Sequence, residues 1–314
     1  MKNSRTAVFG FLSLLFPLSL IISSSAAQAQ RLEERTTIQT FPVGDQPDAL
    51  TFDGANVWVA NSLDDTVTKL RASDGAPQGI FAVGDFPQWI TFDGTNVWVS
   101  NTFSDNVTKL LASDGTVLGT FAVGNGPEGI AWDGQNIWVA NNLDNSVSKL
   151  RGDGVLLGNF RVGKAPWGVV FDGADIWVAN GNSDTVSKLR ARDGAPLGEF
   201  PVGDRPIHLL FAGKKIWVGN ASDATLTILR ARDGEVQGTV PVGSYPLGLA
   251  FDGSNIWSAS LLTDTVYRLS AKNGATRGTV TVGLHPLDVL FDGMSVWVAN
   301  GDSDTVAKIT HTAQ

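Results

Sequence analysis

The segment PEGIAWDGQNIWVANNLDNSVSKLRGDGVLLGNFRVG, Pro127–Gly163, contains the pattern that decides the fold of this chain. Its Asp-Gly turn signals, at Asp133 and Asp153, are spaced as in a series of short antiparallel strands. The segment predicts strands at 128–132, 136–140, 147–151 and 157–162, with a polar loop at 141–146. The second of these, NIWVA, is apolar on both faces and therefore needs cover on both sides.

The same unit recurs seven times along the chain. A Phe-Asp-Gly landmark or a variant of it recurs at intervals of 40, 40, 39, 40, 40 and 40 residues. The landmarks begin at Phe52, Phe92, Trp132, Phe171, Phe211, Phe251 and Phe291. A Trp follows each of them six residues later, at Trp58, Trp98, Trp138, Trp177, Trp217, Trp257 and Trp297. Radially stacked four-stranded sheets would cover both faces of each unit, which predicts an all-β, seven-bladed β-propeller.

The two ends of the repeat region predict a closed ring rather than an open array of sheets. The seventh copy stops after its third strand, at 306–309, and an unmatched strand precedes the first copy, at 38–44. The two fragments make one complete blade, so we expect the N-terminal strand to join the C-terminal blade. An open array would instead carry polar capping repeats at its ends. We assign residues 37–311 to the propeller, 30–36 to a linker and 312–314 to a tail.

The first 29 residues have the composition of a secretory signal peptide. Lys2 and Arg5 precede an apolar stretch at 7–22, and Ala27-x-Ala29 matches a cleavage site. An uncleaved membrane anchor is the alternative, but the apolar stretch is short for a full span and contains a proline. We expect cleavage near Ala29, a periplasmic or secreted location, and no membrane span in the mature protein.

Charge and cysteine content exclude several classes of function. The chain has 31 acidic and 23 basic residues, and its formal net charge is −8. This balance disfavours binding to a phosphate backbone, so we predict no nucleic-acid partner. The chain contains no Cys, which excludes disulfides and a thiol nucleophile. It also lacks the zinc-protease, nucleophile-elbow and P-loop motifs, so catalytic residues stay unassigned, and we predict no cofactor or metal and a monomer.

Residues that occur in nearly every copy are expected to serve the blade. The seven Trp are predicted to be buried between blades, with each indole N–H bonded to a partner. An Asp or Asn seven positions later is expected to close a turn before the third strand; calcium binding is the alternative. These residues are Asp65, Asp105, Asn145, Asp184, Asp264 and Asp304. A Lys recurs on the third strand and is expected to be solvated, at Lys69, Lys109, Lys149, Lys188 and Lys308.

Residues that depart from the repeat, where loops converge, are the candidate site. The loops that join successive blades, from Val-Gly through Pro, are expected to open onto one end of the central channel. Their variable positions are Phe86, Gln88, Trp89, Glu128, Lys164, Trp167, Arg205, His208, Tyr245, His285 and Asp288. All of these except Gln88 are proposed to bind a ligand at the axial mouth, because apolar walls with a few polar groups are typical of pockets. The alternative is that Trp89 and Trp167 simply plug the channel.

Two stretches carry a family resemblance. YPLGLAFDGSNIWSAS (Tyr245–Ser260) and WVANNLDNSVSKL (Trp138–Leu150) resemble the YVTN-type repeat and related NHL-repeat propellers. The resemblance covers 37–309 and implies a seven-bladed propeller, but it leaves function open because such propellers serve several purposes.

A more distant resemblance is to streptogramin (virginiamycin B) lyases, metal-dependent propellers with D-G-x-x-W-F-T-E repeats. This chain keeps the Asp-Gly and the Trp, but an Asn replaces the Glu at Asn61, Asn101, Asn141, Asn180, Asn220 and Asn300.

The sequence thus favours an exported, non-enzymatic propeller that presents its axial mouth, or a flat face, to a small ligand or a protein partner. The alternative is a metal-assisted lyase or a lactonase-type hydrolase, for which the second resemblance is the model. Under that alternative His208 and His285 would be acid–base or metal-binding residues, and Mg²⁺ or Ca²⁺ would be the cofactor.

Overall fold

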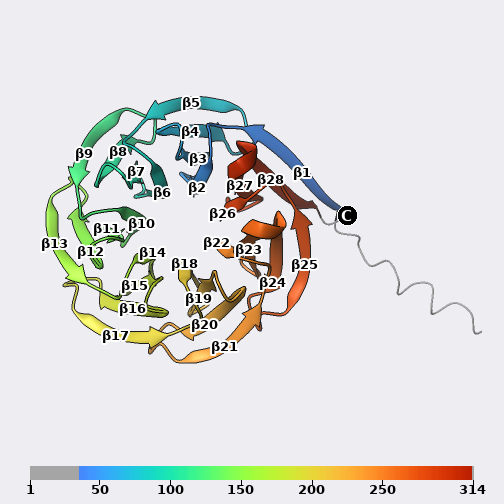
Figure 1. Ribbon diagram of the computed structural model, residues 1–314. Helices are drawn as coiled ribbons and strands as arrows, with labels where there is room; N and C mark the ends of the chain where they lie inside the picture. Colours follow the sequence, from blue (N-terminus) through green and yellow to red (C-terminus); the bar gives the residue numbers. More distant parts are fainter. Residues whose placement is uncertain (1–34, 313–314) are drawn as a thin grey trace, which may run out of the picture. The chain divides into compact units, whose positions relative to one another are not determined.

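The computed structural model describes residues 35–312 and contains seven four-stranded antiparallel sheets arranged as a ring (Figure 1). The prediction of a seven-bladed, all-β propeller is confirmed. Residues 37–310 form one compact unit. The predicted signal peptide and most of the predicted linker lie outside the described residues. Between residues 35 and 312 no helix is long and apolar enough to cross a membrane.

Blades are numbered by the order of their innermost strands, and each of the first six runs outward in chain order. Blade 1 contains β2 (Pro47–Phe52), β3 (Asn56–Asn61), β4 (Thr66–Arg71) and β5 (Pro77–Ala82). Blade 2 contains β6 (Pro87–Phe92), β7 (Asn96–Asn101), β8 (Asn106–Leu111) and β9 (Val117–Ala122). Blade 3 contains β10 (Pro127–Trp132), β11 (Asn136–Asn141), β12 (Ser146–Arg151) and β13 (Leu156–Arg161). The bounds of the blade 3 strands agree with the predicted ones to within one residue at every end.

The remaining blades repeat this arrangement. Blade 4 contains β14 (Pro166–Phe171), β15 (Asp175–Asn180), β16 (Thr185–Arg190) and β17 (Pro196–Pro201). Blade 5 contains β18 (Pro206–Ala212), β19 (Lys215–Asn220), β20 (Thr225–Arg230) and β21 (Val236–Pro241). Blade 6 contains β22 (Pro246–Phe251), β23 (Asn255–Ser260), the short 3₁₀ helix η1 (Leu261–Thr263), β24 (Thr265–Ser270) and β25 (Thr276–Thr281).

Blade 7 closes the ring with strands from both ends of the chain. It contains β26 (Pro286–Phe291), β27 (Val296–Asn300), η2 (Gly301–Ser303), β28 (Thr305–Thr312) and β1 (Arg35–Pro42). Its strand order is β1-β28-β27-β26, so the N-terminal strand is the outer strand of the last blade, as predicted. The Val43 N–H also donates to the Asp304 carbonyl at 3.1 Å. Pairing the two ends leaves no unfinished blade whose open edge could aggregate.

The core lies between blades and is built on the seven Trp. Each is fully buried and packs on apolar side chains of a neighbouring blade, as Trp138 does on Val169, Ile176 and Val178. In six blades the indole N–H donates to the Asp of the preceding Asp-Gly turn, for example from Trp138 to Asp133 at 2.8 Å. The predicted burial is confirmed for all seven Trp, and the predicted indole hydrogen bond for six; the indole nitrogen of Trp217 is buried without a partner in the described residues.

The recurring Lys residues are not solvated, which corrects the expectation from the sequence. Lys149 is only 6% exposed, and its ammonium lies 5.0 Å from the Trp138 ring. The same ammonium donates to the carbonyls of Ala191 at 2.7 Å and Arg192 at 3.1 Å in the next blade. The hydrocarbon chain of Lys149 crosses the blade interface beside the indole. Contacts with the two carbonyls and the Trp ring then replace the water that the ammonium group loses on burial. Alternation along the strand could not reveal this, because the acceptors belong to another blade.

The recurring Asp and Asn residues also act between blades. Side-chain hydrogen bonding to backbone was expected, but within the residue's own turn. Instead, Asp105 Oδ1 accepts from the Gly126 N–H at 2.8 Å, in the loop that enters the next inner strand. The same bond recurs for Asp65, Asn145, Asp184, Asp264 and Asp304. The ring of Asx residues therefore fastens the loops that surround the channel mouth.

Candidate functional site

The axial mouth is lined by the residue that follows Pro at the start of each inner strand. In chain order these residues are Asp48, Gln88, Glu128, Trp167, Ile207, Leu247 and Leu287. At this position blades 1–3 carry two carboxyl groups and an amide, whereas blades 4–7 carry apolar side chains; Asp288 of blade 7, one position further along its strand, adds a third carboxyl group. The mouth is chemically divided into a polar half and an apolar half.

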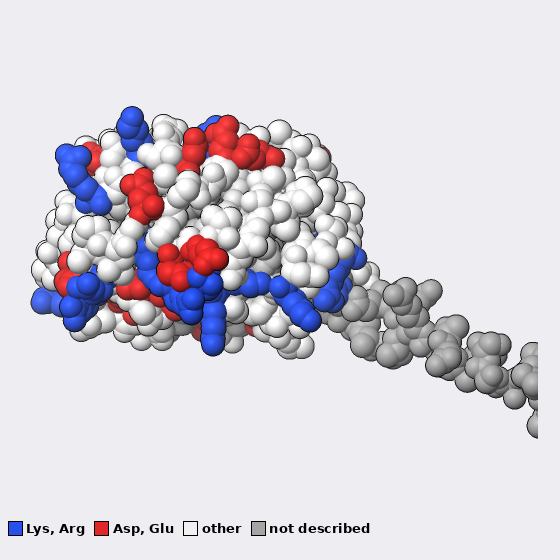
Figure 2. Space-filling view, turned by 90° about the horizontal axis from the view of Figure 1, so that it is seen from below, with Lys and Arg blue, Asp and Glu red and all other residues white. Residues whose placement is uncertain are grey.

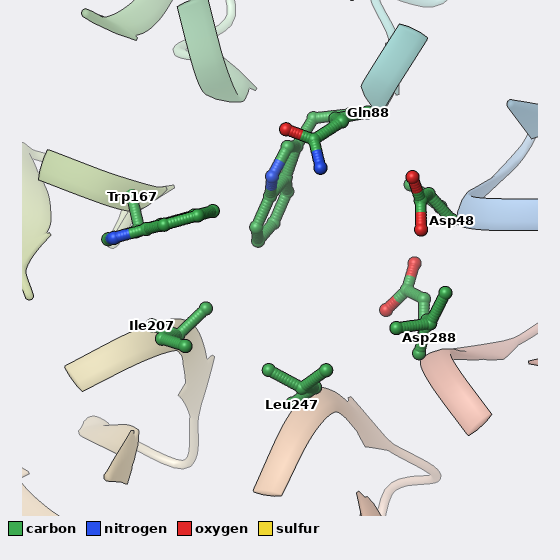
Figure 3. A pocket seen from close by; sticks show the side chains of 9 residues that line it. Asp48, Gln88, Trp167, Ile207, Leu247 and Asp288 are labelled. Carbon is green, nitrogen blue, oxygen red and sulfur yellow. The ribbon is translucent and has the colours of Figure 1, made fainter. Parts of the chain in front are cut away.

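A cavity of about 90 Å³ occupies the mouth. It is lined by Asp48, Ala49, Gln88, Trp89, Trp167, Ile207, Leu247, Leu287 and Asp288. Figure 3 shows Asp48 and Asp288 side by side at one side of the cavity, with Trp167 and Ile207 across from them. Because a single water needs roughly 10–15 Å³ of such volume, the space fits a small polar group or several waters.

Glycines bring the inner strands close together below the mouth. A Cβ at Gly129 would lie 2.3 Å from the Trp167 carbonyl oxygen, and one at Gly248 would lie 2.4 Å from the Asp288 Cα. Both positions therefore require glycine, because a side chain there would collide with backbone. The equivalent positions in blades 2, 5 and 7 carry Trp89, His208 and Asp288, so these three side chains occupy the channel.

Trp89, which lines the cavity, packs against His208. Their rings stack with centroids 5.0 Å apart and an interplanar angle of 22°. The His208 Nε2 lies 3.7 Å from Asp288 Oδ1. Burial lowers the pKa of His208 to about 4, so the imidazole is neutral at pH 7. A neutral, stacked imidazole therefore lies beside the cavity without adding charge to it.

Three carboxyl groups near the cavity have raised pKa values, with burial as the main cause in each. The pKa of Asp48 rises to about 6, that of Asp288 to about 7 and that of Glu128 to about 8. The charge of Asp48 raises the other two further. Like charges that share a poorly solvated site oppose one another's ionisation. At neutral pH the cluster therefore holds protons that a cation could displace.

The three carboxyl groups differ in their hydrogen-bond partners. Asp288 accepts from the Leu50 N–H at 2.9 Å and from its own strand at Val289 at 2.8 Å. One end of the Gln88 amide lies 2.7 and 2.9 Å from the two Glu128 oxygens. Asp48 Oδ2, by contrast, is buried and accepts no hydrogen bond. Side-chain hydrogen bonds from Ser62, Gln46 and Gln88 partly offset the raised pKa of this carboxyl group, but its Oδ2 atom has no donor, and buried polar atoms normally have a partner.

The structure divides the ten residues predicted for the site into two groups. Trp89, Trp167 and Asp288 line the cavity, and His208 and Glu128 contact residues that line it. The other five, Phe86, Lys164, Arg205, Tyr245 and His285, lie in the loops before each Pro, at the rim, and do not line the cavity.

The rim residues contact other residues of the mouth loops and do not line the cavity. Arg205 and Tyr245 have left-handed backbone, and the Arg205 guanidinium lies 5.6 Å from the Tyr245 ring centroid. The imidazole Nδ1 of His285 lies 2.5 Å from Asp302 Oδ2. The Lys164 N–H donates to Ser183 Oγ at 2.8 Å.

Sequence reasoning missed Asp48, Ile207, Leu247 and Leu287. All four follow the Pro of their copy, so reading that single column across the seven copies would have found them. They were passed over because an Asp or a Leu in an inner strand does not stand out by residue type. Within residues 35–312, no group of three or more His, Asp or Glu residues could hold a metal ion.

Two solved structures are similar to this chain. One is a streptogramin B lyase structure, with a TM-score of 0.78 and 16% identity over 90% of this chain and 100% of that one. The other is the hydrazine synthase of Kuenenia stuttgartiensis, with a TM-score of 0.75 and 20% identity over 86% of this chain and 97% of that one. No family model and no curated protein sequence matches the chain. At these identities the two likenesses establish the propeller fold.

Proposed function

We propose that this chain is an exported binding protein whose axial mouth takes a small organic cation, an ammonium group on an apolar body. The observation that carries the proposal is the buried, unpartnered Oδ2 of Asp48 beside Asp288, opposite an apolar wall. An ammonium group would supply the missing donor and offset the repulsion between the carboxylates. The apolar body would lie on Trp167 and Ile207, where burial of its surface favours binding.

The charge of the mouth face supports a cationic ligand. Its loops carry Lys164 and Arg205 as their only Lys or Arg residues. The same loops carry Asp45, Asp64, Asp65, Asp85, Asp105, Asp144, Asp184, Asp204, Asp223, Asp264, Asp302 and Asp304. A face of one sign raises the local concentration of the opposite ion and speeds its association.

The opposite face differs in charge. Its turns carry the pairs Arg190–Asp193 and Arg230–Asp233, and Arg192 and Arg232 beside them are largely exposed. In the edge-on view of Figure 2, most of the visible Lys and Arg side chains gather along one rim of the blades.

Binding should depend on pH in a defined direction. The folded pKa values of Asp48, Asp288 and Glu128, about 6, 7 and 8, lie above their ordinary values. A cation favours the ionised carboxylates, so its binding releases protons, and affinity rises as pH increases from 5.5 to 8.5. An alkylammonium, with a pKa of about 10, stays charged throughout this range.

Isothermal titration calorimetry with phenethylamine tests the proposal. The controls are the neutral 2-phenylethanol and the anionic 3-phenylpropionate. We expect binding of the amine alone, with heats that differ between buffers of different ionisation enthalpy because protons are released. Asp48→Asn should weaken binding about tenfold or more, since it removes a buried charge partner. Asp45→Asn, on an exposed carboxylate of the same loop, is the matched control and should change affinity less than about twofold.

The proposal fails if the alcohol binds as well as the amine, or if Asp45→Asn and Asp48→Asn have equal effects. Export is a separate part of it and rests on residues 1–29. Expression of the full-length chain in a bacterial host should yield a protein that begins near residue 30 outside the cytoplasm. A cytoplasmic product with an intact N-terminus would contradict export.

A lyase is the second candidate, because His208 and Asp288 lie together beside the cavity. A neutral imidazole next to a carboxyl group could accept and return a proton. The fold is similar to a streptogramin B lyase structure, but the described residues do not form a metal-binding group that such chemistry would use. Turnover of a cyclic depsipeptide or a lactone with added Mg²⁺, lost in His208→Ala, would favour this candidate over the binding protein.

A further inference from the structure

Large apolar side chains stand exposed around the mouth. Leu63 in blade 1, Phe103 in blade 2 and Leu143 in blade 3 are 56%, 70% and 73% exposed. Each occupies the second position after the buried Asn that ends the second strand of its blade. Leu262 at the same position in blade 6 and Leu284 in the loop before blade 7 are 61% and 54% exposed. We call these five residues the crown.

Backbone hydrogen bonds anchor the loops that carry the crown residues. The Phe103 N–H donates to the Asp85 carbonyl at 3.2 Å, and the Leu143 N–H donates to the Asn125 carbonyl at 3.2 Å. These bonds tie each loop to the loop that enters the inner strand, so the side chains project from an anchored backbone. The Phe103 ring also stacks on Phe86, with centroids 4.5 Å apart. The crown residues therefore stand on an ordered, hydrogen-bonded backbone.

The fold does not require apolar residues at these positions. Blades 4 and 5 have Asn182 and Ser222 there, whose N–H groups donate to the preceding loop at 3.1 and 3.3 Å, and blade 7 has Asp302 in the 3₁₀ helix η2. Single exposed apolar residues are ordinary on protein surfaces. Here, however, they recur at one loop position in three successive blades around one opening. Repetition of an exposed apolar residue where polar residues also fold indicates a surface used for binding.

Charge around the crown narrows the choice of partner. Asp64 and Asp144 directly follow Leu63 and Leu143, and Asp85 lies in the loop bonded to Phe103. Negative charge would repel anionic lipid, nucleic acid and the same face of a second copy. A partner with apolar and basic side chains would match both features of the surface.

We infer that the crown and the mouth together bind a basic, apolar polypeptide segment, with one of its ammonium groups in the cavity beside Asp48. The inference rests on the proposed cation site and names the class of molecule that carries the cation. The apolar side chains of the segment pack on Phe103 and Leu143, and its charges lie among the loop carboxylates. A lysine side chain or a terminal amino group supplies the ammonium.

Fluorescence anisotropy with a labelled ten-residue peptide of alternating Lys, Leu and Phe tests the inference, with phenethylamine calorimetry in parallel. The crown variant Phe103→Ser/Leu143→Asn installs the residue types found in blades 5 and 4, so the fold should be kept. We expect this variant to weaken peptide binding about tenfold or more, because two apolar side chains that the bound peptide would cover are lost. The amine should bind the crown variant within about twofold of the parent protein.

Two further variants complete the design. Asp48→Asn should weaken both the peptide and the amine. Leu156→Ser/Leu157→Ser changes two exposed apolar residues of β13, on the outer strand of blade 3, and should affect neither. Raising NaCl from 50 to 300 mM should weaken the peptide, since its charges face exposed carboxylates.

The outcomes separate the two proposals. If the amine binds but the crown variant leaves the peptide unaffected, the inference is wrong and the cation site stands. If the peptide binds through the crown while no amine binds and Asp48→Asn has no effect, the cation site is wrong, and the inferred ammonium contact with it. Crown-dependent binding to anionic vesicles would overturn the inference in favour of a lipid surface. Loss of peptide binding in the β13 control would also contradict it.

Discussion

Blade 3 and blade 5 have the same four strands but differ at several polar positions of the repeat. In blade 3, Asp133 accepts from the Trp138 indole at 2.8 Å, and Lys149 donates to carbonyls of the next blade. Blade 5 has Ala212 and Ile228 at these two positions. Its Trp217 indole nitrogen is buried and makes no hydrogen bond within residues 35–312.

Blade 5 replaces one of the lost contacts by a different route. Lys215, on β19 where most other blades have Asn, donates to the carbonyls of Lys272 at 2.9 Å and Ala271 at 3.3 Å. Its hairpin differs as well, because Gly213 and Lys214 both have left-handed backbone, at φ 58° and 67°, as in a two-residue type I′ turn. The carbonyls at the blade interface are served in both cases, whereas the indole partner is not. The comparison indicates that the interblade cation matters more than the residue that supplies it.

The largest expected effect removes the feature that both blades share. Trp138→Ala and Trp217→Ala should each lower the free energy of unfolding by about 3–5 kcal/mol, the usual cost of truncating a buried large aromatic side chain. Denaturant unfolding measures both. Trp167→Ala, at the cavity wall, is the matched control and should cost clearly less. Equal losses at all three positions would contradict the division between blade core and mouth.

Removing the interblade ammonium should have the next largest effect. Lys149→Met keeps the length of the side chain but leaves two buried carbonyls without their donor, at a cost of about 2 kcal/mol. Lys215→Met should cost a similar amount, because it serves the equivalent carbonyls in blade 6. A silent Lys215→Met would show that blade 5 does not depend on the substitute cation, and the comparison would then fail.

A smaller change measures what the hydrogen bond between the indole and Asp133 contributes to stability. Trp138→Phe removes the N–H that Asp133 accepts, whereas Trp217→Phe removes an N–H without a partner. Trp138→Phe should therefore be more destabilising than Trp217→Phe by about 1 kcal/mol, the net worth of one hydrogen bond. The difference between the two variants in thermal or denaturant unfolding is the measurement, and the lost ring volume is common to both. No difference would mean that the Asp–Trp bond adds nothing to stability.

The smallest expected effect is a gain. Ala224 has left-handed backbone at φ 54°, at the position where six other blades have an Asp or Asn that bonds to the next loop. Ala224→Asn should raise stability by about 1 kcal/mol, because Asn tolerates this backbone and can accept from the loop N–H near Tyr245. Asn145→Ala in blade 3 is the reverse change and should lower it similarly. Destabilisation by Ala224→Asn would contradict the proposed role of the Asx ring.

The repeat also explains which parts of the mouth could be anticipated. Trp89, Trp167, His208 and Asp288 were predicted because they break a repeated position with an unusual residue type. The polar and apolar halves were not predicted, because each half consists of ordinary residues in one column of seven copies. Asp48 gains its importance only from burial and from its position beside Asp288, which lies 240 residues later in the chain, in the blade that closes the ring.

The sequence by itself determined the number of blades, the closure of the ring and the buried Trp row. Strands of one blade are consecutive in the chain, so periodicity and turn residues report directly on them. Only the tertiary structure decided where the polar side chains of the repeat find their partners. Lys149 reaches an acceptor 42 residues away, and Asp288 meets a donor 238 residues away. The first pair forms only when blades 3 and 4 pack together, and the second only when the ring closes. No local pattern encodes which group of the next blade a side chain will meet.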